Sequence, residues 1–377
     1  MSKNKRVCID INSIVPLSHQ GYLSGVGRTT LELVKALGEL KNELPFELVL
    51  YTQNMKGISS RYFELLFESK HIYLRNTPFF KKTVKLSYGK ELLTQYDLLH
   101  IPHNFDYVAQ PEKTIITLHD AMFFSYSENF LGHDFARENY PGLAQKCKGI
   151  VTCSESSKHD IVKYMNVPEE KVTVIHWGVS DKNFYPETKN IIESIGQKYD
   201  LRKPYFIMTS CDIGRKNTEL LMENFVNYLH QGGDYNLVLI WKNPPQVLLK
   251  KHKKEIELKR ICFLGGISDD DLRALYSGAT ACFFPSKYEG FGLPILESMA
   301  CGTPIVTCNN SSLPEVGGNA ALYVPEESST EMADLMMQFE KGQINLIKQK
   351  EKVLQQAAQF SWKTAAEKYV DFYMKYL

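Results

Sequence analysis

Short runs of β-forming residues alternate with longer helical patterns along this chain, and the whole alternation occurs twice. The first series comprises the runs 7–11, 46–51, 97–101, 114–118, 150–153 and 172–175. The second series begins after a polar stretch near residues 180–200 and comprises 205–209, 237–240, 261–264, 281–284, 305–308 and 321–324. Strands separated by helical segments form βαβ units, which build parallel sheets. The pattern therefore predicts two α/β sheets in tandem.

Several of these runs, such as 115–118 and 237–240, are apolar at consecutive positions, as in central strands covered by helices on both faces. Ligands of such sheets bind beyond the carboxyl ends of the strands. We therefore expect a first domain over residues 1–182, a second over 183–358, a hinge near 178–186 and an active site between the domains. The final segment, 359–377, carries aromatic residues at the spacing of one helix face, which predicts a helix packing back on the first domain.

Composition narrows the class of protein. A chain of 377 residues fits two domains of ordinary size. Lys and Arg number 44 against 43 Asp and Glu, so there is no general attraction to nucleic acid. The eight cysteines form no CxxC pair, which indicates free thiols in a reducing compartment. Because no apolar run reaches about 18 residues, we expect neither a membrane span nor secretion, and hence a cytoplasmic protein.

The segment 284–306, FPSKYEGFGLPILESMACGTPIV, is the most informative part of the sequence. A strand is followed by a glycine turn, and Pro294 stands where a helix can begin. Gly290 and Gly292 let the backbone approach a ligand closely, and the helix N-terminus favours negative charge. Glu289 and Glu297 flank this turn, and carboxylates suit sugar and ribose hydroxyls. When the two glutamates are considered alone, the alternative is that both are solvated surface residues.

A basic pair stands in the segment MTSCDIGRKNTELLMENF, just before a predicted helix. Arg215 and Lys216 precede Asn217 and Thr218, either of which can cap that helix. Two cations at a helix N-terminus can clamp a diphosphate. On composition alone, an ordinary basic surface loop explains the pair equally well.

Two further places at predicted strand ends carry candidate residues. Gly25 and Gly27 precede an amphipathic helix, although a lone Gly-x-Gly also fits an ordinary strand-to-helix loop. His119 and Asp120 end a buried strand, where their side chains can bind hydroxyls or position a nucleophile. His100 and His103 end another strand, and acceptor binding and a plain loop role are equally compatible with them.

The phrase EGFGLPILE, from Glu289 to Glu297, resembles the signature of the retaining GT-B glycosyltransferases called family 4, and the likeness extends over nearly the whole chain. The resemblance implies that Glu289 lies against the donor sugar, that Glu297 holds the nucleotide ribose and that the backbone of 290–293, including Phe291 and Leu293, contacts the sugar and phosphates. It also implies donor contacts for the Arg215–Lys216 pair and for Gly25 and Gly27, and catalytic roles for His119 and Asp120.

Two places depart from the family's pattern. Ser210 and Cys211 stand where many relatives have Gly-Arg, so phosphate neutralisation is expected to rest on Arg215 and Lys216. His176 and Trp177 replace the Pro-Asn that usually precedes the interdomain turn.

The resemblance implies a mannosyltransferase-like enzyme that moves a hexose, with retention, from a nucleotide sugar such as GDP-mannose or a UDP-hexose to a glycan or lipid-linked acceptor in surface polysaccharide synthesis. A UDP-glucose-type hexosyltransferase on a soluble or protein acceptor and a non-catalytic sugar-nucleotide-binding protein are the alternatives. No cofactor or metal is expected, because residues 269–271 read as the capped start of a helix instead of a metal site. Basic patches at 79–90 and 248–260 fit solvated helix faces or peripheral contact with anionic lipid.

Overall fold

The structure is a computed structural model, and it describes residues 5–14, 16–17, 23–52, 73–76, 95–103, 108–126, 133–201, 203–327 and 330–377. The chain divides into two compact units. The first comprises Met1–Gly178 and Ser361–Leu377, and the second comprises Val179–Phe360. These bounds lie close to the boundaries expected after residues 182 and 358.

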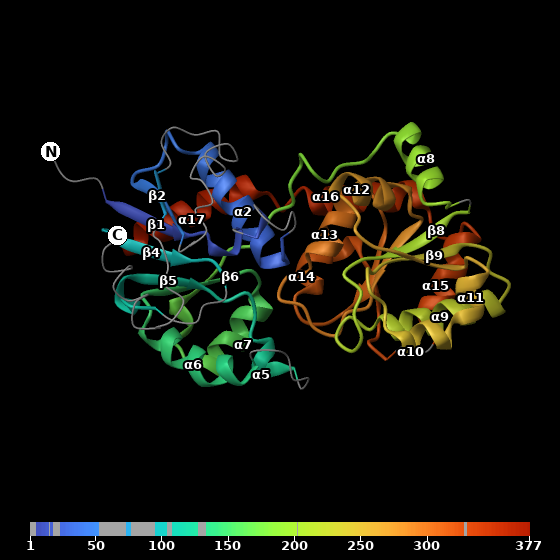
Figure 1. The fold of residues 1–377 in the computed structure, drawn as a ribbon, viewed down its shortest axis with the longest axis horizontal. Coiled ribbons are helices and arrows are strands. Elements are labelled where there is room, and N and C mark those ends of the chain that lie inside the picture. The colour runs from blue at the N-terminus through green and yellow to red at the C-terminus, as the bar shows by residue number, and fades with distance from the viewer. Residues whose placement is uncertain are drawn as a thin grey trace. The chain divides into compact units, whose positions relative to one another are not determined.

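The first unit is built on a parallel sheet of seven strands in the order β3-β2-β1-β4-β5-β6-β7 (Figure 1). The strands are β1 (Arg6–Asp10), β2 (Glu47–Thr52), β3 (Tyr73–Asn76), β4 (Leu98–Ile101), β5 (Thr114–Thr117), β6 (Gly149–Thr152) and β7 (Val172–Val174). The central strand β1 pairs with β2 through Val7 and Leu48 and with β4 through Val7 and Leu98. Sequence patterning predicted each of these strands except β3, whose residues YLRN form no apolar run.

Helices cover both faces of this sheet, with α2 and α17 on one face and α6 and α7 on the other (Figure 1). The helices are α2 (Gly25–Glu39), α5 (Met122–Ser125), α6 (His133–Lys146), α7 (Glu155–Met165) and α17 (Trp362–Tyr376), with 3-10 turns η1 (Asn12–Ile14), η2 (Pro111–Lys113) and η3 (Glu169–Lys171). The C-terminal helix α17 packs against α2, so its aromatic side chains become part of the first unit's core.

The second unit repeats the plan with a parallel sheet of six strands in the order β10-β9-β8-β11-β12-β13. The strands are β8 (Tyr205–Met208), β9 (Asn236–Ile240), β10 (Ile261–Leu264), β11 (Ala281–Phe284), β12 (Ile305–Cys308) and β13 (Leu322–Val324). In each sheet the strand order reverses at the strand that comes first in the sequence, which is β1 in the first sheet and β8 in the second. Open α/β sheets bind ligands at such a point. All six strands coincide with predicted runs.

The helices of the second unit also lie in two layers, with α12, α13 and α16 on one face and α9 and α15 on the other (Figure 1). The helices are α8 (Lys189–Lys198), α9 (Thr218–His230), α10 (Gln246–Lys251), α11 (Lys253–Glu257), α12 (Asp269–Gly278), α13 (Leu293–Ala300), α14 (Leu313–Gly317), α15 (Glu331–Glu340) and α16 (Leu346–Ala357), with the 3-10 turn η4 (Gly318–Ala320). The polar stretch that separates the two series of strands contains α8, which buries none of its residues.

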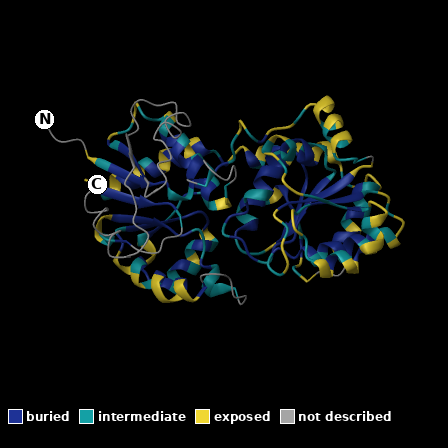
Figure 2. Ribbon diagram, viewed as in Figure 1, coloured by how far each residue is buried: buried dark blue, intermediate teal, exposed yellow. Residues whose placement is uncertain are grey.

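Consecutive burial along the strands confirms that both sheets are covered on both faces. Every residue of β4, β5, β6, β8, β11 and β12 is buried. Figure 2 shows the same distribution, with buried sheets and exposed residues on the outer sides of the helices. The strands are therefore rigid supports for the loops at their carboxyl ends, where the candidate residues lie.

Candidate functional site

A glycine turn joins β11 to α13 in the second unit and carries the most informative motif. Gly292 has φ +110°, a conformation that residues with a side chain rarely adopt, and it stands at the N-cap position of α13. A Cβ there would also approach Leu313 to 3.2 Å. Pro294 lies in the first turn of the helix, as predicted. The backbone from Glu289 to Leu293 therefore follows a path that depends on glycine.

The carboxylate of Glu289 is the centre of a buried cluster of polar groups. One of its oxygens, Oε1, accepts hydrogen bonds from Lys216 Nζ at 2.6 Å, from Arg215 Nη1 at 2.9 Å and from Ser286 Oγ at 2.6 Å. Lys216 and Glu289 are only 8% and 9% exposed. The arginine also donates to the carbonyl of Tyr288 at 2.7 Å. The structure therefore brings together two predicted elements, the basic pair and the first glutamate of the motif.

Two basic side chains face one carboxylate in this cluster, and burial lowers the pKa of Lys216 while Glu289 acts to raise it. Burial acts to raise the pKa of Glu289, but Lys216 and Arg215 outweigh it and lower that pKa below its ordinary value. Glu289 is therefore ionised at neutral pH and cancels one of the two positive charges. One positive charge remains at the carboxyl ends of β8 and β11, which pair directly with each other. This excess favours an anionic ligand.

Serine side chains fix the glycine turn to the loop after β12, and sequence reasoning missed them. Ser311 Oγ accepts the backbone N–H of Glu289 at 3.0 Å. Ser312 Oγ, which is fully buried, lies 2.9 Å from the carbonyl of Glu289 and 2.8 Å from that of Phe291, and it donates to them. Ser286 was missed as well. Serine in a loop has no sequence pattern that marks such a contact.

The predicted capping of α9 by Asn217 or Thr218 is wrong. Asn217 does occupy the N-cap position, but it has φ +59° and its side chain caps nothing. Its amide instead donates to the carbonyl of Glu326 at 2.8 Å, and Thr218 Oγ1 accepts the N–H of Asp212 at 3.1 Å. The left-handed conformation turns the asparagine side chain away from the helix. Its role is to hold the loop that presents Lys216.

Glu297, the second glutamate of the motif, lies in α13 and is 9% exposed. Its charge acts on Tyr276 and Cys301, whose pKa values are raised first by burial and then by this carboxylate. Both motif glutamates are thus buried acids in the second unit. This burial argues against the simple reading of solvated surface residues.

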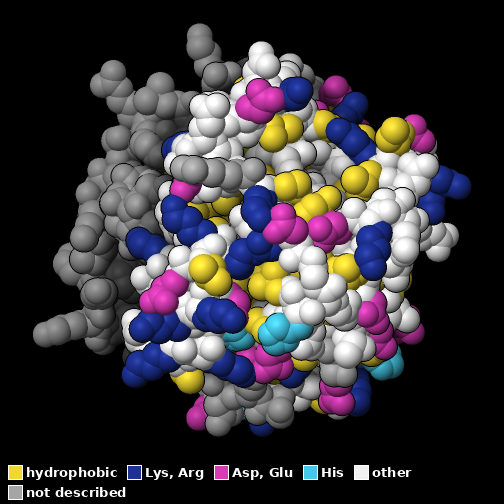
Figure 3. All heavy atoms as spheres, turned by 90° about the vertical axis from the view of Figure 1, so that its right-hand side faces the viewer, with side chains coloured by type: hydrophobic (Ala, Val, Ile, Leu, Met, Phe, Trp, Pro, Cys, Tyr) yellow, Lys and Arg dark blue, Asp and Glu magenta, His cyan; other side chains and the backbone are white. Residues whose placement is uncertain are grey.

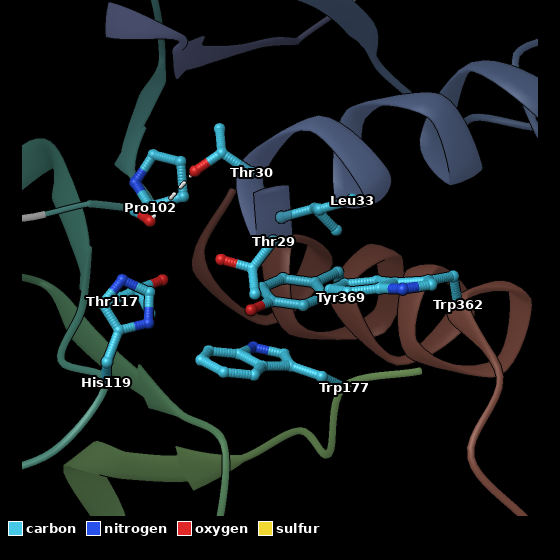
Figure 4. Close-up of a pocket in the computed structure, with 9 residues that line it drawn as sticks. All are labelled: Thr29, Thr30, Leu33, Pro102, Thr117, His119, Trp177, Trp362 and Tyr369. Carbon is cyan, nitrogen blue, oxygen red and sulfur yellow. Dashed lines mark hydrogen bonds between the residues drawn. The ribbon is translucent and has the colours of Figure 1, made fainter. Parts of the chain in front are cut away.

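His119, the candidate at the end of β5, lies beside a small cavity of the first unit (Figure 4). The cavity measures about 10 Å³ and is lined by side chains that include Thr29, Trp177 and Tyr369. The ring of His119 faces the backbone carbonyl of Pro102 and has no side-chain hydrogen-bond partner within the described part of the chain. Burial and, secondarily, His103 lower its pKa to about 4, against a smaller opposing effect of the Pro102 carbonyl. The ring is therefore neutral at pH 7.

The other histidines near these strand ends have structural partners. His100 is fully buried and contacts Tyr373 Oη at 2.7 Å and Thr117 Oγ1 at 2.8 Å, so the structure supports a core role and not acceptor binding. His103 Nε2 lies 3.0 Å from the carboxylate of Asp10, at the end of β1. Asp120 accepts the N–H of Met122 at 2.9 Å and so holds the start of α5. The catalytic role expected for Asp120 stays a prediction.

The two glycines at the start of α2 differ in their surroundings. A Cβ on Gly27 would lie 2.5 Å from the carbonyl oxygen of Ser13, so glycine is needed for close packing there. Gly25 is exposed, and a Cβ would meet nothing within 4 Å. Packing thus accounts for Gly27, while Gly25 leaves open space at the first turn of the helix.

Among the described residues, no group of three or more His, Cys, Asp or Glu side chains could hold a metal ion. Asp269, Asp270 and Asp271 form the first turn of α12, capped by Ser268, as predicted. No helix in the described ranges is long and apolar enough to cross a membrane.

The basic segment 248–260 lies on the outer face of the second unit, where Lys and Arg side chains alternate with Asp and Glu (Figure 3). Lys251 pairs with Glu219 and Glu223, and Arg260 pairs with Asp234. Acidic neighbours thus neutralise part of this patch, which supports the solvated-face interpretation. The other basic patch, 79–90, lies outside the described residues.

Comparison with known proteins gives one family match for each unit. The model described as Glycosyltransferase Family 4 matches residues 23–183, and the model described as Glycosyl transferases group 1 matches residues 192–360. O-antigen chain mannosyltransferase B of Escherichia coli is 27% identical over 370 residues, which are 93% of this chain and 96% of that protein. The serotype-specific mannosyltransferase WbdA of the same species is 30% identical over 71% of this chain, but the match spans 34% of that protein.

Solved structures share the fold. The structure of HepE from Anabaena in complex with UDP and glucose superimposes with a TM-score of 0.72 at 15% identity, over 98% of this chain and 100% of that one. At this identity the likeness concerns the GT-B arrangement of two sheets, and it agrees with the fold class predicted from the sequence.

Proposed function

This chain belongs to the glycosyltransferases, with a family 4 domain followed by a group 1 domain, and we propose from this premise that it transfers mannose from GDP-mannose to a glycan or lipid-linked oligosaccharide in surface polysaccharide synthesis. The names of its relatives support the sugar, because O-antigen chain mannosyltransferase B matches along almost its whole length. The same relative supports the class of acceptor.

The observation that carries the proposal is the excess positive charge at Lys216, Arg215 and Glu289. When the sugar leaves its donor, the bond from the anomeric carbon to the diphosphate oxygen breaks and negative charge develops on the departing nucleoside diphosphate. Preorganised cations in a buried site stabilise such charge more than water does. We assign this task to Lys216 and Arg215, together with the backbone amides of the turn from Gly290 to Gly292.

Glu289 has two roles in this proposal. Its oxygen Oε1 holds both cations in place, and its carboxylate also accepts a hydroxyl of the donor sugar. Glu297 is proposed to bind the ribose hydroxyls, as the family resemblance implies. In the first unit, we assign His119 to a sugar hydroxyl, since its ring is neutral and its nitrogens have no side-chain partner among the described residues.

We further propose that transfer retains the anomeric configuration and needs no metal. The acceptor oxygen bonds to the anomeric carbon from the face that the diphosphate leaves, and the acceptor's proton passes to a phosphate oxygen of the leaving group. Lys216 and Arg215 supply the positive charge that a divalent cation provides in other phosphate-transfer sites. We also propose peripheral contact with anionic lipid through those cations of 248–260 that acidic residues do not neutralise.

A donor with uracil in place of guanine is the second candidate. Its support is the fold shared with HepE, which was solved with UDP and glucose. In that case the chain would transfer a glucose-like hexose to a soluble or protein acceptor.

Calorimetric titration with GDP, UDP and ADP, followed by turnover with the matching sugar conjugates, tests the proposal. We expect tightest binding to GDP and transfer from GDP-mannose. Lys216→Ala and Glu297→Ala should each remove most turnover in a folded protein, whereas Lys250→Ala, on the exposed face of α10, should not. Binding of UDP alone would move the donor to a UDP-hexose. Failure to bind any nucleotide would refute the transferase assignment in favour of a different ligand.

A further inference from the structure

A chain of polar contacts runs through the core of the first unit from the C-terminal helix. Tyr373, on α17, contacts His100 Nδ1 at 2.7 Å, and His100 Nε2 contacts Thr117 Oγ1 at 2.8 Å. Burial lowers the pKa of His100 to about 3, so this imidazole is neutral. Its two nitrogens therefore have opposite roles, one as donor and one as acceptor. Such a group orders the hydroxyls on either side of it.

The series of polar contacts continues at Tyr369, one helical turn earlier on α17. The hydroxyl of Tyr369 hydrogen-bonds with Thr117 and with Trp177. An indole N–H can only donate, so the oxygen of Tyr369 accepts the bond from Trp177. Tyr369 is 1% exposed and Trp177 is 8% exposed. In this setting, each lost hydrogen bond leaves a buried polar group without its partner.

Trp177 is the last member of this series of polar contacts, and it packs against His119. The two ring centroids lie 5.2 Å apart at 61°, an edge-to-face contact. Figure 4 shows both side chains, with Tyr369, around the same cavity. The backbone of His119 is held separately, because its carbonyl accepts from Cys153 Sγ and Ser157 Oγ, each at 3.1 Å.

The imidazole of His119 has no side-chain hydrogen-bond partner among the residues that the structure describes, and the backbone carbonyl of Pro102 faces it. Its orientation therefore depends on this carbonyl and on the packing of its neighbours, among which Trp177 supplies an aromatic wall. A shift of that wall would let the imidazole rotate about its side-chain bonds, while the backbone stayed in place. Small displacements of a catalytic group have large effects on rate.

We propose that Trp177 and Tyr369 are positioning residues for His119, so that the C-terminal helix sets the orientation of a substrate-binding imidazole at the end of β5. The inference rests on the proposed function of His119. It also gives a purpose to Trp177, which stands where the family's pattern has asparagine. The route is Tyr369 on α17, the indole of Trp177 and then the ring of His119.

A purely structural role would give a different result from a positioning role. Tyr369→Phe keeps the ring and removes only the hydroxyl that binds Trp177. Trp177→Phe keeps an aromatic wall but loses the N–H. Phe372→Leu is the matched control, because Phe372 is also a buried aromatic residue of α17 and the rings that it contacts, Tyr373 and Tyr376, are not members of the route from Tyr369 through Trp177 to His119.

The experiment compares kcat, donor KM and thermal unfolding for these three variants and for His119→Ala. We expect Tyr369→Phe and Trp177→Phe to lower kcat by about tenfold or more with donor KM unchanged, and Phe372→Leu to keep kcat despite a comparable loss of Tm. An inactive His119→Ala protein with fully active Tyr369→Phe and Trp177→Phe would overturn the positioning inference alone. Equal loss of kcat in Phe372→Leu would overturn it too. A fully active His119→Ala protein would refute the role of His119 itself.

Discussion

Replacing Lys216 with methionine should destabilise the second unit in a way that depends on Glu289. The change keeps most of the side-chain volume and removes the charge that lies 2.6 Å from the carboxylate. Removing one partner of a buried ion pair costs roughly 3–5 kcal/mol, since the other charge stays buried. Arg215 and Ser286 still contact Glu289 here, so we expect the lower end, about 3 kcal/mol.

For a unit of this size, 1 kcal/mol corresponds to about 2–4 °C in Tm, and the expected loss is therefore about 6–12 °C. Differential scanning calorimetry without nucleotide measures it on the whole chain. The double variant Lys216→Met/Glu289→Gln removes both charges and should lose less than the sum of the two single variants. Lys250→Met is the control for loss of an exposed lysine. A Tm within about 2 °C of the parent for Lys216→Met, or strict additivity in the double variant, would refute this reasoning.

Three other predictions test separate features. Lys216 and Arg215 lower the pKa of Glu289 in the folded state against the effect of burial. The stability that this carboxylate contributes is therefore complete above its ordinary pKa and is lost as pH falls through the lowered value. Glu289→Gln should reduce this loss of stability at acidic pH, as measured by denaturant unfolding at a series of pH values. Gly27→Ala should destabilise the first unit by about 1–3 kcal/mol, because the added Cβ would press on the Ser13 carbonyl. Gly25→Ala should leave Tm unchanged. Equal Tm values for the two variants in thermal unfolding would contradict the packing argument. Turnover should persist after treatment with EDTA, and activity lost on chelation and restored by Mg²⁺ or Mn²⁺ would show that the cations of the cluster are insufficient.

The strands could be predicted because burial on both faces requires apolar residues at successive positions. The twelve runs found in the sequence all became strands. The strand β3 was missed because only four residues of mixed polarity form it. The helix α8 was missed for a related reason, since it has no buried face.

The contacts of the site were harder to predict than its members. The sequence places Lys216 after one strand and Glu289 after another, 73 residues later. Their meeting depends on β8 lying next to β11, although β9 and β10 come between them in the chain. His100 is a similar case, because its partner Tyr373 lies 273 residues away. Long-range pairing of this kind follows from topology, which local patterns do not encode.

The return of the chain to its first unit affects how the protein folds as it is made. Gly178 lies against the backbone of Ser361 and Trp362, so the chain leaves and re-enters that unit at one place. On the ribosome, residues 1–178 emerge before the second unit, but α17, the helix that buries His100, emerges after it. Domains usually fold in order of synthesis. Here the second unit can complete its core earlier, and the first keeps a surface open until α17 has emerged.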